Sequence, residues 1–126
     1  MLLPAEFFQI RLELAREKGH PDGDRRTGYD IIAPLDSDGR LMPDLWKSHQ
    51  ARCRVRHFQN GADDRVGRLR RHPGGSWYFD YDPERREDNE TGYRLSDEKF
   101  VVGEYVSIPD EHQKMHTYRV VSVRPA

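Results

Sequence analysis

The sequence is poor in cysteine and in long apolar segments, and each shortage narrows the class of protein. Its one cysteine, Cys53, excludes an intramolecular disulfide framework and fits a reducing compartment. No stretch approaches ~18 consecutive apolar residues, so no transmembrane helix is predicted. The first residues lack the basic stretch that begins a signal peptide. We therefore expect a cytoplasmic protein.

The composition predicts one small folded domain. Hydrophobic residues make up 35% of the 126 residues and charged residues 34%, so the core is small and the surface strongly charged. A net charge of −1 is too low for the self-repulsion that keeps polar chains unfolded. We expect a single β domain over residues 1–126, with residues 82–91, which contain no apolar side chain, as an exposed loop.

Apolar and polar residues alternate in the first and last parts of the chain, which is typical of half-buried strands. Residues 8–14 and 29–35 predict one antiparallel hairpin, joined by a loop over residues 19–27. Residues 100–108 and 116–123 predict a second hairpin. The end of its last strand is apolar in both alternating positions, which indicates a central or barrel-closing strand buried on both faces.

The middle of the chain adds one helix and several short strands. Pro43 and Asp44 are typical of a helix start, and Leu45, Trp46, His49 and Cys53 follow at helical spacing, which predicts about three turns with Trp46 as the anchor. Strands are predicted over residues 52–58, 66–71, 76–81 and, as a short strand or turn, 93–95. The fold class is therefore mainly β: an antiparallel, barrel-like sheet of about seven strands with one short α-helix.

Charge is distributed unevenly along the chain. Arginine outnumbers lysine 17 to 4, which GC-rich coding alone would explain, and residues 52–72 hold seven arginines against two aspartates. If Cys53, Val55 and Leu69 face the core, strand alternation turns the neighbouring polar positions outward on adjacent strands. The predicted binding residues on that outward face are Arg54, Arg56, Arg68, Arg70 and Tyr78.

Three interpretations of these arginines stay open. In the first, acids that include Asp80, Asp82, Glu84 and Glu87 pair with them across strands, with little effect beyond local stability. In the second, the arginines bind a protein partner or another anionic partner, so that the chain is a non-enzymatic binding or adaptor domain. In the third, they bind nucleic acid with help from aromatic side chains, although a pI near 6.6 makes a protein partner the better prediction. An unpaired strand edge would also allow a homodimer.

No motif in the sequence predicts a metal, a cofactor or a catalytic centre. Cys53 has no nucleophile signature around it and reads as a small buried hydrophobe. His112 and His116 have the spacing of two zinc ligands on a helix, but they flank a predicted hairpin loop. Residues 36–39 (DSDG) lack the later acids of a calcium loop, and residues 73–75 (PGG) lack the lysine of a phosphate loop; both predict turns.

One enzymatic or ligand-binding alternative also stays open. Asp80 and Asp82 share one side of a predicted strand, as paired catalytic carboxylates do. A small barrel can hold a ligand at its mouth, and such a site would be lined by Trp77, Tyr105 or Tyr118 with a converging histidine or aspartate. We expect the interior to be filled by side chains instead, because so few strands leave little room.

The chain resembles a group of short uncharacterised bacterial proteins. The resemblance rests on GYDIIAPLDSDGRL at residues 28–41, YFDYDPE at 78–84 and FVVGEYVSI with HTYRVVSV across residues 100–123. It implies a self-contained cytoplasmic domain and brings no assigned activity. The segment GEYVSI and the returning strand are also similar to the hairpin of small SH3-like barrels, over about a fifth of the chain.

Overall fold

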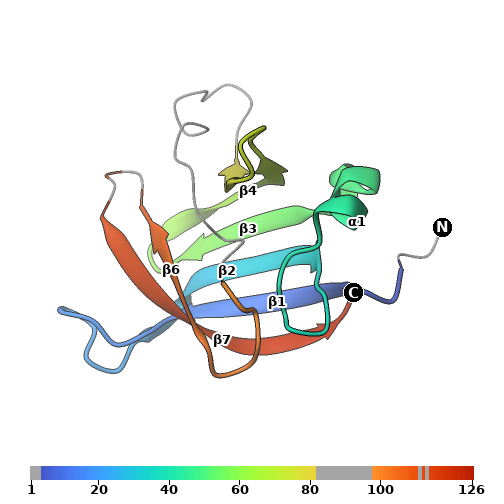
Figure 1. Ribbon diagram of the computed structural model, residues 1–126. Coiled ribbons are helices and arrows are strands. Elements are labelled where there is room, and N and C mark those ends of the chain that lie inside the picture. Colours follow the sequence, from blue (N-terminus) through green and yellow to red (C-terminus); the bar gives the residue numbers. More distant parts are fainter. Residues whose placement is uncertain (1–3, 82–97, 111, 113) are drawn as a thin grey trace.

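Seven antiparallel strands form one sheet in the part of the chain that the structure describes. The computed structural model describes residues 4–81, 98–110, 112 and 114–126. The spatial order is β5-β4-β3-β2-β1-β7-β6, and Figure 1 shows the sheet curled into a half-barrel. The strands are β1 (Phe7–Leu14), β2 (Asp24–Pro34), β3 (Arg54–Gln59), β4 (Ala62–Arg71), β5 (Trp77–Asp80), β6 (Tyr105–Pro109) and β7 (Met115–Pro125). The predicted fold class is confirmed.

The inner face of the sheet carries the core. Alternate side chains of every strand point inward, and the largest that are almost fully buried are Trp77, Phe7, Phe79 and Phe100. Gly67 lets the edge of the sheet curl, because a Cβ there would lie 2.1 Å from the carbonyl oxygen of Asp80. The buried side chains of the inner face form one hydrophobic core.

Both predicted hairpins are present, and β7 shows why its sequence is apolar in both alternating positions. β7 lies between β1 and β6, so it is central as expected. Its pairing with β1 shifts where Leu12 faces Val120 and Arg11 faces Ser122, which leaves Val121 as the extra residue of a bulge. The bulge resets the alternation, so Val120 before it and Val123 after it both pack on the core. The predicted burial of both faces was wrong.

Several predicted boundaries were also wrong. β2 begins at Asp24, inside the predicted loop 19–27, and β4 begins at Ala62, before the predicted start at residue 66, because pairing in the sheet overrides local turn preference. Residues 100–104 precede β6 instead of belonging to it. Phe100 there is buried without being in a strand, and its N–H donates to the carbonyl of Gly39 at 2.8 Å.

The helical segment is shorter than the predicted three turns. α1 spans Pro43–Ser48 and a separate 3-10 turn, η1, spans Gln50–Arg52, so Cys53 follows the helical region instead of ending it. Trp46 is the expected anchor: its Nε1 donates to the carbonyl of Leu69 at 2.8 Å, and its ring meets Trp77 edge-on. No helix in the described residues is long and apolar enough to span a membrane. The predicted loop 82–91 and the predicted element 93–95 lie outside the described residues.

Candidate functional site

The predicted arginines lie together on the outer face of β3 and β4. Val55 and Leu69 are buried, and Arg54, Arg56 and Arg68 between them are exposed. Arg70 on β4 is half-buried and lies opposite Tyr78 of β5, whose ring stacks on His72 at 4.1 Å between centroids. Strand alternation thus places all five predicted residues on one sheet face, which we call the arginine face: Arg54, Arg56, Arg68, Arg70 and Tyr78.

Two of these arginines are neutralised by aspartates of the same face. Arg56 pairs with Asp30 of β2, and its other nitrogen lies 3.3 Å from Asp64. Asp30 also accepts from Arg11 of β1 at 3.4 Å, so one half-buried carboxylate joins three strands. The Nε of Arg70 donates to Asp80 at 2.7 Å. These pairs leave Arg56 and Arg70 with little net charge to offer a partner.

An aromatic ring lies beneath the neutralised arginines. Phe58 points to the outer face yet is only 8% exposed, because the Arg11 guanidinium lies 4.3 Å and that of Arg56 5.5 Å from its ring centroid. Phe58 occupies the space left by Gly28, where a Cβ would lie 2.9 Å from the ring. The Arg56 side chain therefore covers apolar surface as well as pairing with Asp30.

Arg54 and Arg68 differ from Arg56 and Arg70, which pair with aspartates. They are direct cross-strand partners, and neither has an ion pair or a hydrogen bond from its side chain within the described residues. Like charges placed directly opposite each other destabilise a sheet. Asp80 lies opposite Arg68 on the other side, but its carboxylate is bonded to Arg70. Two exposed guanidinium groups therefore face each other with no counter-charge from the part of the chain that the structure describes.

The acids that pair with this face are only partly those expected. Asp80 does pair, but the other partners are Asp30 and Asp64. The remaining acids that the sequence suggested, Asp82, Glu84 and Glu87, lie outside the described residues. Alternation already turns Asp30 outward, since it stands between Tyr29 and Ile31. Its partners could not be predicted, because nothing local shows that β2 pairs with β3.

Cys53 and the turn at residues 36–39 have the structural settings that the sequence favoured. Cys53 is buried, and burial raises the pKa of its thiol to about 12, so no reactive thiolate forms near neutral pH. The Asp36 side chain accepts from the N–H groups of Asp38 and Arg40, as in a turn. No group of three or more metal-ligating side chains is arranged around a cation position in the described residues.

A small cavity lies at the mouth of the half-barrel. It lies under the β6–β7 loop and under the segment that joins β1 to β2, residues 15–23, which we call the β1–β2 arm. It has a volume of about 220 Å³ and is lined by Tyr118, Leu14, Thr27, Gln59, Glu17, Asp110 and four histidines, His20, His57, His112 and His116. Of the aromatic residues suggested for such a site, only Tyr118 is there. Trp77 is buried in the core, and Tyr105 is 59% exposed on the outer face. The volume is below the ~300 Å³ of ordinary ligand sites.

His116 fastens the mouth of the half-barrel. Its Nδ1 lies 3.1 Å from Glu17 of the β1–β2 arm and its Nε2 lies 2.8 Å from Asp110. Burial disfavours the imidazolium form, but the hydrogen bonds to Asp110 and Glu17 outweigh it and raise the pKa of His116. The stabilisation from this bridge is present below the unfolded pKa of ~6.5 and is lost as pH rises through the raised value.

His57 lines the same cavity, and its pKa is lowered where that of His116 is raised. This lowered pKa gives a testable pH dependence of stability. Burial, with the charge of Arg65, lowers the pKa of His57 to about 4, while its ring stacks on Tyr29. The unfolded chain therefore binds a proton at higher pH than the folded chain. We expect the free energy of unfolding to fall by about 2–3 kcal/mol between pH 6.5 and 4.5, measured by urea denaturation.

The control for this pH dependence is His57→Phe, which keeps an aromatic ring against Tyr29 and removes the proton site. Its stability should change much less between the two pH values. His116 contributes only a small slope of opposite sign in this range, because its folded form stays protonated while its unfolded form gains the last part of a proton just below pH 6.5. An equally steep loss in His57→Phe would show that other groups, such as Asp110, carry the acid sensitivity.

Comparison with known proteins provides no assignment for these sites. No family model matches the sequence, and no curated protein and no solved structure is significantly similar to it. The resemblance to short bacterial proteins and to SH3-like hairpins stays a prediction.

Proposed function

We propose that the protein is a binding or adaptor domain that captures an acidic segment of a partner protein on its arginine face. The observation that carries this proposal is the facing pair of Arg54 and Arg68, two exposed like charges with no counter-charge in the described residues. Such a local conflict destabilises the sheet, and natural proteins keep such conflicts mostly where function requires them. A carboxylate from a partner would bridge both guanidinium groups.

The surroundings of this pair favour a protein over a nucleic acid. Val66, next to Arg68 on the same face, is 54% exposed and offers an apolar contact beside the charges. Asp30, Asp64 and Asp80 already pair with Arg56 and Arg70, so within the described residues the face leaves Arg54 and Arg68 rather than the continuous row of positive charge that a phosphate backbone needs. The net charge of −1 agrees with this choice.

The variant Arg54→Glu separates binding from folding. It places a carboxylate opposite Arg68, so the free energy of unfolding should rise by about 0.5–1 kcal/mol. The same change should weaken capture of a deca-glutamate peptide by about tenfold or more at low salt, because it removes one guanidinium and repels the ligand. Urea denaturation and fluorescence anisotropy measure the two effects.

Arg40→Glu is the matched control, because Arg40 is exposed on the loop before α1, away from the arginine face. It should leave peptide binding unchanged. Equal binding by wild type and Arg54→Glu would contradict the proposal. Tighter binding of single-stranded DNA than of the peptide, with an affinity that falls steeply with salt, would assign the face to nucleic acid instead.

A further inference from the structure

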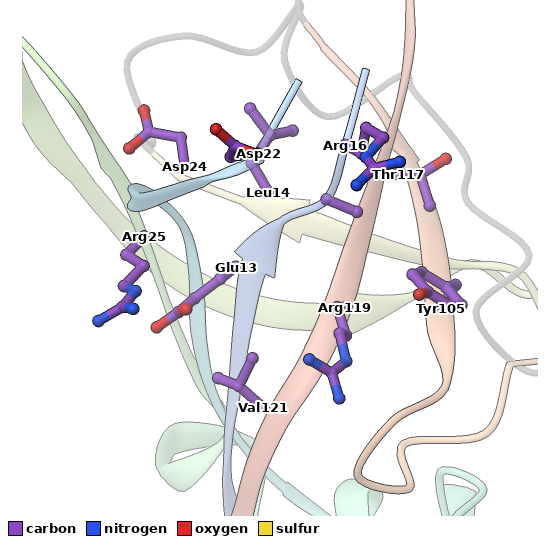
Figure 2. A pocket seen from close by; sticks show the side chains of 11 residues that line it. Glu13, Leu14, Arg16, Asp22, Asp24, Arg25, Tyr105, Thr117, Arg119 and Val121 are labelled. Atoms are coloured by element: carbon purple, nitrogen blue, oxygen red, sulfur yellow. The ribbon is translucent and has the colours of Figure 1, made fainter. Parts of the chain in front are cut away.

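A separate groove lies on the outer face of the sheet near β6 and β7, away from the arginine face on β3 and β4. The β1–β2 arm passes these two strands there. Its volume is about 690 Å³, well within the range of ligand sites. Figure 2 shows Arg119 of β7 lying between Glu13 and Tyr105, with Arg16 and Thr117 further along the same wall. Asp24 and Arg25 of β2 lie on the other side of Glu13.

Among the residues that the structure describes, the positive charges of the groove have no partner, whereas most of its acids have one. Glu13 is opposite Arg119 in register, but its carboxylate is bonded to Arg11 at 3.0 Å. Asp24 accepts from the N–H of Arg26 and from the hydroxyl of Thr27, both at 2.9 Å. In contrast, no ion pair or side-chain hydrogen bond engages the groove's three guanidinium groups within the described residues: Arg16, Arg25 and Arg119.

Tyr105 adds a flat apolar surface beside these charges. It is the direct cross-strand partner of Arg119, so the two side chains emerge about 5 Å apart on the same face. Tyr105 is 59% exposed, so its ring is accessible to a ligand in the groove. An anion held by Arg119 would therefore bring whatever ring it carries against Tyr105.

We propose that this groove binds a small molecule in which a phosphate or carboxylate is attached to a flat ring. Arg119 holds the anionic group, since a guanidinium group binds both oxyanions with paired hydrogen bonds. Tyr105 stacks on the ring, and Thr117 offers a hydroxyl at the same wall. The site shares no residue with the arginine face, so it stands or falls independently of the proposed function.

The test is titration of the full chain at low salt with AMP and with indole-3-acetate, followed by NMR chemical shifts and calorimetry. Saturable binding of AMP with shifts at Tyr105 and Arg119 would support a phosphate ligand, and of indole-3-acetate a carboxylate ligand. Arg119→Ala and Tyr105→Ala should each weaken that binding by about tenfold. Both residues are exposed, so the fold should be kept, which circular dichroism checks.

Arg40→Ala is the matched control, because Arg40 is exposed on the loop before α1 and does not line the groove, so the affinity should stay unchanged. Inorganic phosphate that binds as tightly as AMP would overturn the role of Tyr105. No saturable binding of either probe, or equal binding by Arg119→Ala, would overturn the site.

Discussion

Gly67→Ala should lower the free energy of unfolding by about 3 kcal/mol, although it adds a single methyl group. The added Cβ would lie 2.1 Å from the carbonyl oxygen of Asp80 and 2.5 Å from the Cα of Tyr81. Both contacts are with backbone, so no side chain can rotate away and β5 must move off β4. Urea denaturation measures the loss of stability.

Gly74→Ala is the control for this prediction. Gly74 lies in the turn before β5, and a Cβ there would meet nothing within 4 Å. The substitution should therefore be neutral or slightly stabilising, because alanine restricts the unfolded chain more than glycine does. Equal stability of the two variants would show that the curled edge of the sheet tolerates displacement of β5.

Trp77→Ala should have a comparable or larger effect, with a loss of about 3–5 kcal/mol. The Trp77 side chain is 1% exposed and packs edge-on against Trp46, at 5.3 Å between ring centroids. Its removal leaves a cavity between β5 and α1, so the anchor of the helix loses its partner. Thermal and urea denaturation should both show the loss.

Trp77→Phe distinguishes packing from hydrogen bonding at this position. The Nε1 of Trp77 is buried with no hydrogen-bond partner among the described residues, so phenylalanine should cost much less than alanine. Trp46 differs, because its Nε1 donates to Leu69. If Trp77→Phe were as unstable as Trp77→Ala, the indole would have a role beyond filling this volume.

The local pattern of residues predicted a large part of the fold. Alternation in residues 8–14 located β1 almost to the residue, and it turned Arg54, Arg56, Arg68 and Arg70 to one face, because successive side chains of a strand point to opposite sides. The bulge at Val121 could not be predicted in this way. It depends on how β7 pairs with β1, which short-range pattern does not encode.

The candidate sites needed information from farther along the chain. The groove beside Tyr105 combines Arg16 of the β1–β2 arm with Arg119 of β7, about a hundred positions later in the sequence. The same is true of His116, whose partner Glu17 is 99 positions away. Only the proximity of these segments in the folded chain shows that they form a site.

Local residue pattern is enough to predict an antiparallel β domain, and in β3 and β4 it also predicts which side chains face water, because the period of a strand is a local property. Which charges find partners depends instead on contacts between strands that are distant in the sequence. Asp30 neutralises Arg56 while Arg54 and Arg68 face each other, and that difference comes from register between strands that the chain brings together from distant segments. Register depends on the whole sheet and its curl, so the charge that a partner meets is a property of the fold.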